Sequence, residues 1–187
     1  MMDQRAFLLA LLFRMRSNER VRAALSDLGA SEEEMHRAHQ AAEGLGFETA
    51  QAAQYLETLG PPISSAVDTS VDASSPFAGS RMLRFALPLW PGLDFALRAH
   101  PAGYTWGRCF LRSVGAATPP LTTVRDLAPW RFVDTEVTQA FGPTKSEDAW
   151  AEWEDLSASI PESPGGPARR YLLRFDLGLL QAIEPLG

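Results

Sequence analysis

The chain of 187 residues has few of the side chains that form covalent crosslinks or metal sites. It contains one cysteine, Cys109, and three histidines. A single cysteine excludes an intramolecular disulfide framework and a cysteine-based zinc site. The chain therefore fits a reducing compartment, and we expect a cytoplasmic protein.

Excess positive charge is also missing. Residues 1–60 carry six basic and nine acidic side chains, and residues 61–187 carry eleven and fourteen, so each part has a net charge of −3. Proteins that bind nucleic acids usually neutralise phosphates with a cluster of Lys and Arg. Neither part shows such a cluster, and we do not expect nucleic acid as a partner.

Apolar runs in this chain are short. The run from Ala6 to Phe13 covers eight residues, whereas a transmembrane helix needs about 20. Acidic Asp3 before the run and Arg14 after it do not match a signal peptide. We predict a buried helix here and no association with a membrane.

Sequence motifs for enzyme chemistry are lacking as well. The chain has no G-x-S-x-G motif, and its paired glycines at 165–166 stand between prolines with no helix start after them. A phosphate-binding loop needs glycines that lead into a helix. We therefore predict a protein that is not an enzyme, with no catalytic, cofactor-binding or metal-ligating residues and no cofactor.

Helix signals follow one another through residues 1–60. Asp3 can cap a helix that runs to about Arg16, and a second helix begins at Asn18 and stops at Gly29. Ser31 and Glu34 form the S-x-x-E capping box of a third helix. A fourth, over 50–59, has Thr49 as its cap and ends at Gly-Pro-Pro. These signals predict an all-α module of about four short helices.

A change of period follows residue 60. Residues 61–80 are rich in Ser, Asp and Pro and predict a linker. After the linker, apolar residues alternate over 83–87, 93–97 and 104–110 and again over 171–177, which predicts β-strands. Residues 114–145 are broken by prolines and remain unassigned. One helix, over 147–156, would pack on the sheet through Trp150, Trp153 and Leu156.

These patterns together predict an α+β protein. A helical module at 1–60 is joined by the linker 61–80 to an α+β domain at 81–187. That domain should hold a mainly antiparallel sheet with one packed helix.

The segment 19–47, ERVRAALSDLGASEEEMHRAHQAAEGLGF, resembles a helix-turn-helix or winged-helix domain. The resemblance implies a DNA-binding transcriptional regulator whose second helix enters the major groove. Two features depart from the family pattern: bulky Leu25 stands where a small residue usually packs, and the recognition helix would begin with Glu32, Glu33 and Glu34. Carboxylates at that place would be repelled by DNA phosphates.

Two further sets of residues invite a functional interpretation. Glu32, His36, His39 and Glu43 share one face of the third helix, as in a metal site, but no second Glu-x-x-His motif completes it, so a solvated face is favoured. Five carboxylates surround two tryptophans in the segment 147–155, an arrangement suited to a basic protein partner. The residues proposed for this contact are Glu147, Asp148, Trp150, Glu152, Trp153, Glu154 and Asp155.

These observations predict a non-enzymatic protein-binding or regulatory protein, such as an adaptor, an immunity-type inhibitor or an assembly factor. The partner would be another protein with a basic surface. The first alternative is a DNA-binding regulator that uses residues 19–47, and the second is an enzyme whose site is assembled from scattered polar residues. A surface helix with both tryptophans in the core and its acids in water also accounts for the segment 147–155, and it is favoured over the interface.

Overall fold

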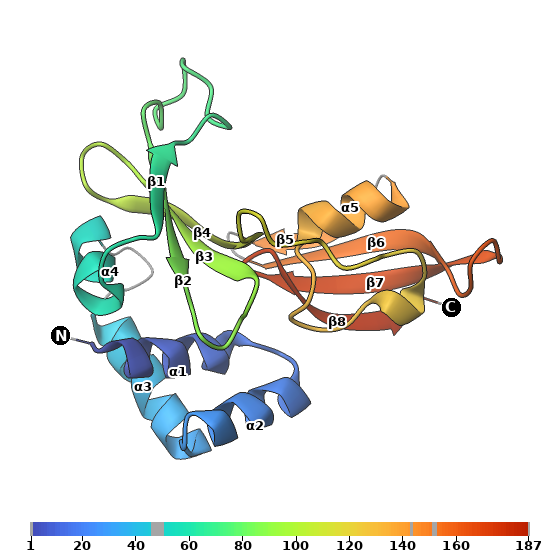
Figure 1. Cartoon of the computed structure of the whole chain (residues 1–187), viewed down its shortest axis with the longest axis horizontal. Helices are drawn as coiled ribbons and strands as arrows, with labels where there is room; N and C mark the ends of the chain where they lie inside the picture. The colour runs from blue at the N-terminus through green and yellow to red at the C-terminus, as the bar shows by residue number, and fades with distance from the viewer. Residues whose placement is uncertain (1, 46–50, 143, 151–152, 187) are drawn as a thin grey trace. The chain divides into compact units, whose positions relative to one another are not determined.

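A computed structural model describes residues 2–45, 51–142, 144–150 and 153–186, without the side chains of 149 and 150. The chain has an α+β fold in which helices α1–α4 precede two antiparallel four-stranded sheets with helix α5 (Figure 1), which confirms the predicted fold class. Contacts divide it into two compact units, Met1–Arg108 and Cys109–Gly187. The first unit therefore contains strands as well as the helices of the predicted module.

The N-terminal helices begin and end close to where their capping signals stand. They are α1 (Gln4–Arg14), α2 (Asn18–Asp27), α3 (Glu32–Gly44) and α4 (Ala52–Leu59). The Ala6 N–H donates to Asp3 Oδ1 (2.8 Å) at the start of α1, and the predicted capping box of Ser31 and Glu34 starts α3. The cap predicted for the fourth helix, Thr49, lies outside the described residues, and Gln51 is the N-cap of α4.

Helix α1 is apolar around much of its circumference because it has neighbours on more than one side. It packs along α3 (Figure 1), and the ring of Phe7 meets the rings of Tyr55 at 6.0 Å and Phe95 at 5.5 Å. Phe7, Tyr55 and Phe95 are all buried. The cluster of these three rings joins the helices and the first sheet into one core. Each large apolar side chain removed from water stabilises the fold by about 2 kcal/mol.

The first sheet has the order β1-β2-β3-β4, formed by β1 (Ser64–Val67), β2 (Arg81–Ala86), β3 (Leu93–Ala99) and β4 (Thr105–Arg112). Strands β2 and β3 pair antiparallel with Phe85 opposite Phe95, as the alternation of apolar residues predicts. The boundary between the two compact units falls within β4.

The segment predicted as a linker contains strand β1 and a loop that is bonded to the sheet. Trp106 Nε1 donates to Ser80 Oγ (2.9 Å), and the ring of Trp106 stacks on Phe77 with centroids 4.5 Å apart. Arg98 lies over the same indole and its Nε is 3.0 Å from Asp68 Oδ2. These contacts hold residues 68–80 against the first sheet.

The second sheet has the order β5-β6-β7-β8 and is a simple antiparallel meander. Its strands are β5 (Lys145–Trp150), β6 (Trp153–Pro161), β7 (Ala168–Asp176) and β8 (Leu179–Pro185), and helix α5 (Asp134–Phe141) packs against β6. A 3-10 turn, η2 (Val124–Asp126), precedes α5. The core of this unit includes Phe132, Val137, Ile160, Leu173 and Phe175.

The connection between β7 and β8 is tight. Asp176 pairs with Leu179 across the strands, and the two residues between them, Leu177 and Gly178, have φ values of 51° and 71°. Both lie in the left-handed region, which matches the type I′ turns that suit the twist of a hairpin. Leu177 tolerates this conformation while its side chain is buried, 1% exposed.

The helix predicted over 147–156 is wrong, because residues 147–150 belong to strand β5 and residues 153–156 to strand β6. Trp150, Trp153 and Leu156 do stand at helical spacing, but Leu156, Ala158 and Ile160 alternate into the core and β6 pairs with β7 along its whole length. Long cross-strand pairing thus overrides a short local helical pattern. The helix of this unit, α5, lies in the stretch that the sequence left unassigned, and strand β8 was not predicted.

None of the helices in the described ranges is both long enough and apolar enough to cross a bilayer.

Candidate functional site

The described residues of the acidic–aromatic segment (147–155) lie on β5, at the edge of the second sheet, and on the neighbouring strand β6. Strand β5 is at one end of the strand order, and its residues Lys145–Asp148 are exposed. Trp150 pairs with Trp153 across β5 and β6. The Trp150 side chain and all of Glu152 lie outside the described residues.

The two strands divide the segment between the two faces of the sheet. Leu156 lies on the core face, so Glu154 shares that face, and the two line a shallow hollow together with Asp134 and Thr138 of α5. Asp155 and Trp153 point to the opposite face. A helix would have placed the acids around the tryptophans, whereas the sheet puts Glu154 on the opposite face from Asp155.

Glu147 is the centre of a polar cluster on the face opposite the core. Its Oε1 accepts hydrogen bonds from Ser157 Oγ (2.7 Å) and Arg170 (3.2 Å), and its Oε2 accepts one from Lys145 Nζ (3.0 Å). The hydrogen bonds from Ser157 and Lys145 hold the pKa of the Glu147 carboxyl below its usual value. The register of β5 against β6 shifts between Ser146 and Asp148, so Glu147 sits at an irregular point of the edge.

A second cluster on this face centres on Arg174 of β7. Its guanidinium lies 3.8 Å from Asp155 Oδ2 and 3.2 Å from Glu184 Oε1. Asp155 is therefore already partnered within the sheet.

Asp148 is an exposed acid of this segment. It stands directly opposite Asp155 in the β5–β6 register, and directly opposed residues lie within about 5.5 Å of each other on the same face. Like charges at such positions repel and destabilise the pairing. A cation brought to this place would relieve that repulsion.

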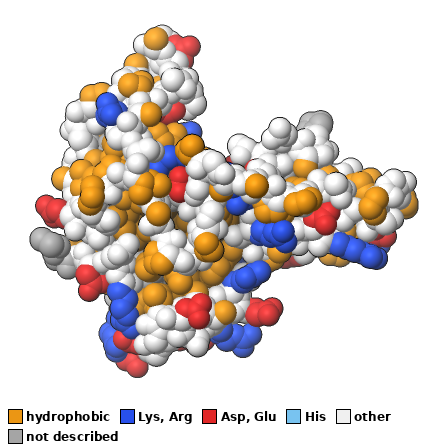
Figure 2. Space-filling model, in the orientation of Figure 1, with side chains coloured by type: hydrophobic (Ala, Val, Ile, Leu, Met, Phe, Trp, Pro, Cys, Tyr) orange, Lys and Arg blue, Asp and Glu red, His pale blue; other side chains and the backbone are white. Residues whose placement is uncertain are grey.

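The charge of the second unit is mixed. On the face seen in Figure 2, acidic and basic side chains are interspersed over its strands and do not form a patch of one sign. The structure brings Glu147, Asp148, Trp153 and Asp155 to one face of the sheet, with Trp153 half-buried. Arg170 and Arg174, which pair with these acids, were not identified from the sequence because they come from another part of the chain, whereas Lys145 lies two residues from Glu147 on the same strand.

The face of α3 that carries Glu32, His36, His39 and Glu43 contacts α1 through its two histidines. The His39 ring stacks on Phe13 with centroids 3.9 Å apart, and the His36 ring meets Phe13 edge-on at 4.9 Å. Within the described residues, no group of three or more His, Cys, Asp or Glu side chains is placed to hold a metal ion. The two imidazoles contribute instead to the contact between α1 and α3.

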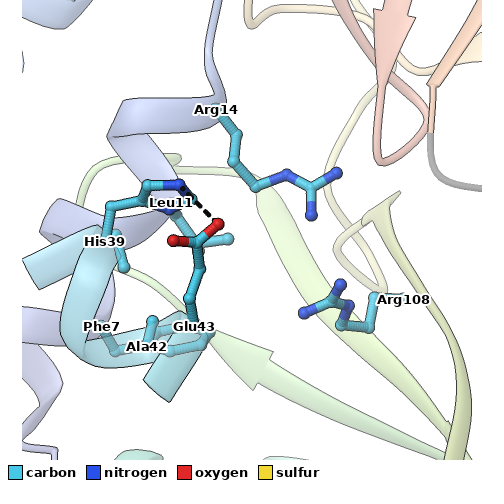
Figure 3. A pocket seen from close by; sticks show the side chains of 8 residues that line it. Phe7, Leu11, Arg14, His39, Ala42, Glu43 and Arg108 are labelled. Carbon is cyan, nitrogen blue, oxygen red and sulfur yellow. Dashed lines mark ion pairs between the residues drawn. The ribbon is translucent and has the colours of Figure 1, made fainter. Parts of the chain in front are cut away.

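A small pocket of the first unit lies beside the same helices. Its cavity volume is about 40 Å³, with a floor formed by Phe7, Ala10, Leu11 and Ala42 and polar walls formed by Arg14, His39, Glu43 and Arg108. Figure 3 shows the guanidinium groups of Arg14 and Arg108 extending into one space from two different elements.

Contacts behind this pocket hold its polar side chains. Arg108 donates a hydrogen bond to Tyr55 Oη (3.1 Å), and His39 Nε2 lies 3.4 Å from Glu43 Oε1. The sequence gives no sign of this pocket, because Arg14 and Arg108 are far apart along the chain and belong to no common motif.

The helices that resemble a helix-turn-helix are present. Residues 28–31 join α2 to α3, Gly29 has a left-handed φ of 56°, and the Ala30 N–H donates to Leu25 O (2.9 Å). The end of the resemblance, Gly46 and Phe47, lies outside the described residues. Glu34 serves the capping box and lies 3.4 Å from Arg5, while Glu32 and Glu33 remain exposed.

Comparison of the chain with protein-family models, with curated proteins and with solved structures finds no match.

Proposed function

We propose that this chain is a non-enzymatic protein-binding or regulatory protein of the cytoplasm that contacts a basic segment of another protein through strand β5. The observation that supports the proposal best is the exposed Asp148 directly opposite Asp155 at the end of the second sheet. A lysine or arginine of the partner would neutralise Asp148, since Asp155 already pairs with Arg174.

The strand order suggests how the partner would bind. An end strand offers outward N–H and C=O groups to an added strand, and side chains at alternate positions give specificity. Charges on an edge strand discourage pairing with strands of like charge. An acidic edge therefore favours an extended basic segment, and Trp153 would add apolar contact area.

The direct test places a photo-reactive amino acid at position 148 in the native host and identifies the crosslinked proteins. We expect a protein with a basic extended segment, crosslinked at 148 but not from position 57, where Glu57 is exposed on α4. Equal yields of the same proteins from both positions, or no crosslink at 148, would contradict the proposal.

Charge reversal tests the same contact with the partner so identified. Asp148→Lys should slow association and weaken its salt dependence, because complementary charge acts mainly on the association rate. Glu57→Lys is the matched control, with the same change of net charge on an exposed helix. An unchanged association rate for Asp148→Lys would argue against β5 as the contact.

DNA binding by α2 and α3 is the alternative, supported by the turn at 28–31 that these helices share with helix-turn-helix proteins. The exposed Glu32 and Glu33 at the start of α3 oppose it. We expect no specific duplex binding in a mobility-shift assay at low salt. A sequence-selective shift that Arg37→Ala abolishes would establish the alternative.

A further inference from the structure

A hollow of about 410 Å³ lies among helices α1, α2 and α3 of the first unit (Figure 1). Its lining comes from all three helices and is mostly apolar, and its polar side chains are Asn18, Arg22 and Glu32. Binding sites for small molecules are typically hollows of roughly 300–1,000 Å³ with an apolar lining and a few polar groups. We infer that this hollow binds an apolar dipeptide with free ends, its carboxylate at Arg22, its ammonium at Glu32 and its side chains on the apolar floor.

The two charged groups of the hollow have bonding capacity for a ligand. Arg22 donates from Nε to the Asn18 carbonyl oxygen (3.3 Å), and its guanidinium forms no ion pair with an acid of the described ranges. Glu32 meets His36 through its backbone oxygen (2.8 Å), which leaves its exposed carboxylate available. A guanidinium donates paired hydrogen bonds to a carboxylate, and a glutamate accepts them from an ammonium. One positive and one negative charge in the lining match a ligand that carries both.

The charges of the hollow stand on different helices. Arg22 lies five residues before the last residue of α2, about 7.5 Å along a helix, and Glu32 is the first residue of α3, beyond the turn at 28–31. The described structure shows no ion pair between these two side chains. In an extended dipeptide the ammonium and the carboxylate are roughly 6–7 Å apart, because each residue spans at most about 3.5 Å. A dipeptide therefore matches two separated charges better than a single amino acid does, since the charged groups of an amino acid share one carbon atom.

The floor of the hollow suits apolar side chains. It consists of buried apolar residues, namely Leu12, Met15, Val21 and Met35. Two of them are methionines, whose flexible thioethers adapt to the shape of a ligand. Phe13 also lines the hollow with 36% of its surface exposed, and its ring is held in place by stacking on His39, with centroids 3.9 Å apart. Side chains that are already ordered lose less conformational entropy when a ligand arrives.

Titration of the full-length protein with L-leucyl-L-leucine at pH 7, followed by heteronuclear NMR at constant ionic strength, tests the inference. We expect a Kd of about 1 mM, typical of a ligand with so few atoms, and shifts of the amide signals of residues 13, 15, 22, 32 and 35. Three analogues each lack one recognised group: the N-acetyl dipeptide lacks the ammonium, the dipeptide amide lacks the carboxylate, and glycyl-glycine lacks the apolar side chains. Each analogue, and free leucine, should bind at least about fivefold more weakly.

Charge variants assign each end of the ligand. Arg22→Gln should weaken binding of leucyl-leucine but not of its amide, because the amide has no carboxylate for Arg22 to bind. Glu32→Gln should in the same way weaken binding of leucyl-leucine but not of the N-acetyl dipeptide. The matched controls are Arg20→Gln and Glu33→Gln, the same changes at exposed positions of the same two helices, and both should leave the affinity for leucyl-leucine within about twofold of the parent.

Three outcomes would overturn the inference: no saturable shift up to about 50 mM leucyl-leucine, equal affinity of the parent protein for the dipeptide and its three analogues, or equal losses for Arg22→Gln and Arg20→Gln. Free leucine that binds as tightly as the dipeptide would reject the match to two separated charges. The amide spectra report directly whether each variant is folded, so a loss of binding in a folded variant cannot be attributed to unfolding. If a variant does not fold, the series of analogues on the parent protein decides alone.

Discussion

The two sheets of this protein place their acidic side chains in different surroundings. In the first sheet, the Asp94 side chain is 2% exposed and its Oδ2 lies 3.4 Å from Arg84. In the second sheet, Glu147 keeps 30% of its side chain exposed and is shared by Lys145 and Arg170. Because both desolvation and Coulomb attraction grow as water is excluded, burial decides how much each pair matters to stability.

The largest effect should come from breaking the buried pair of the first sheet. Arg84→Ala leaves the Asp94 carboxylate in the core without this ion pair, and the loss of one partner of a buried pair costs about 3 kcal/mol in the free energy of unfolding. Urea unfolding at pH 7 measures it.

The double variant Arg84→Ala/Asp94→Asn is the control. It also removes the buried negative charge, so it should recover part of the loss. If the double variant is less stable than Arg84→Ala, then Arg84 does not stabilise the protein by compensating the charge of Asp94.

The pair of Arg112 and Glu136 in the second unit should come next. Arg112 donates from Nε and from its terminal nitrogen to the two oxygens of Glu136, both at 2.8 Å, and the Val133 N–H donates to Oε2 (3.1 Å) at the start of α5. The Glu136 side chain is 9% exposed. Glu136→Gln should lower the free energy of unfolding at pH 7 by about 2 kcal/mol.

The effect of Glu136→Gln should depend on pH. Burial raises the pKa of Glu136, but the hydrogen bonds from Arg112 and Val133 outweigh it and hold the pKa below the usual 4.5. The ionised carboxylate therefore stabilises the fold fully above pH 4.5, and this stabilisation is lost as the pH falls below 4.5 through the folded-state pKa. Guanidinium unfolding at pH 7 and pH 3 should show the difference between the parent and Glu136→Gln shrinking at the lower pH.

A smaller effect is expected at the edge of the second sheet. Glu147→Gln should shift the unfolding midpoint less than Glu136→Gln does, because water screens the contacts of Glu147 with Lys145 and Arg170. Adding 0.5 M salt should remove most of the remaining shift. A loss as large as that of Glu136→Gln would mean that this face is shielded from solvent and would end the contrast between the two environments.

The last contrast is Asp126, a half-buried carboxylate in which hydrogen bonds from the backbone and from hydroxyl groups, and no ion pair, are expected to set the pKa. The N–H groups of Thr122 and Thr123 and the Thr122 hydroxyl donate to its carboxylate and lower its pKa from 3.8 to about 2. This contribution is complete above pH 3.8 and is lost between 3.8 and about 2. A carboxyl-detected NMR titration should give a midpoint near 2 for Asp126, and an ordinary midpoint would show that the turn at η2 does not form in solution.

The helices could be predicted from the sequence because their signals are local. Asp3, Ser31 and Gly29 act on backbone groups within a few residues of themselves, so their capping roles follow from the order of residues alone. The alternation of Leu83, Phe85, Leu93 and Phe95 identified β2 and β3 for a similar reason, since the large apolar side chains stand at alternate positions of each strand and are buried.

The candidate sites depend on contacts between distant parts of the chain. The spacing of Trp150, Trp153 and Leu156 fits a helix as well as two strands, and only the pairing of β6 with β7 decides between them. The partners of Glu147 and Asp155, and the approach of Arg108 to Arg14, likewise arise from the tertiary fold. Period and capping carry no information about such contacts.

The short connection at Leu177 and Gly178 also bears on the order in which the second unit folds. A hairpin closed by so few residues costs little loop entropy and forms within about 1–10 μs. Phe175 and Leu180 face each other across it, so the first strands to pair already bury two core side chains. A meander that grows outward from this turn next adds β6, which pairs with β7 along its whole length.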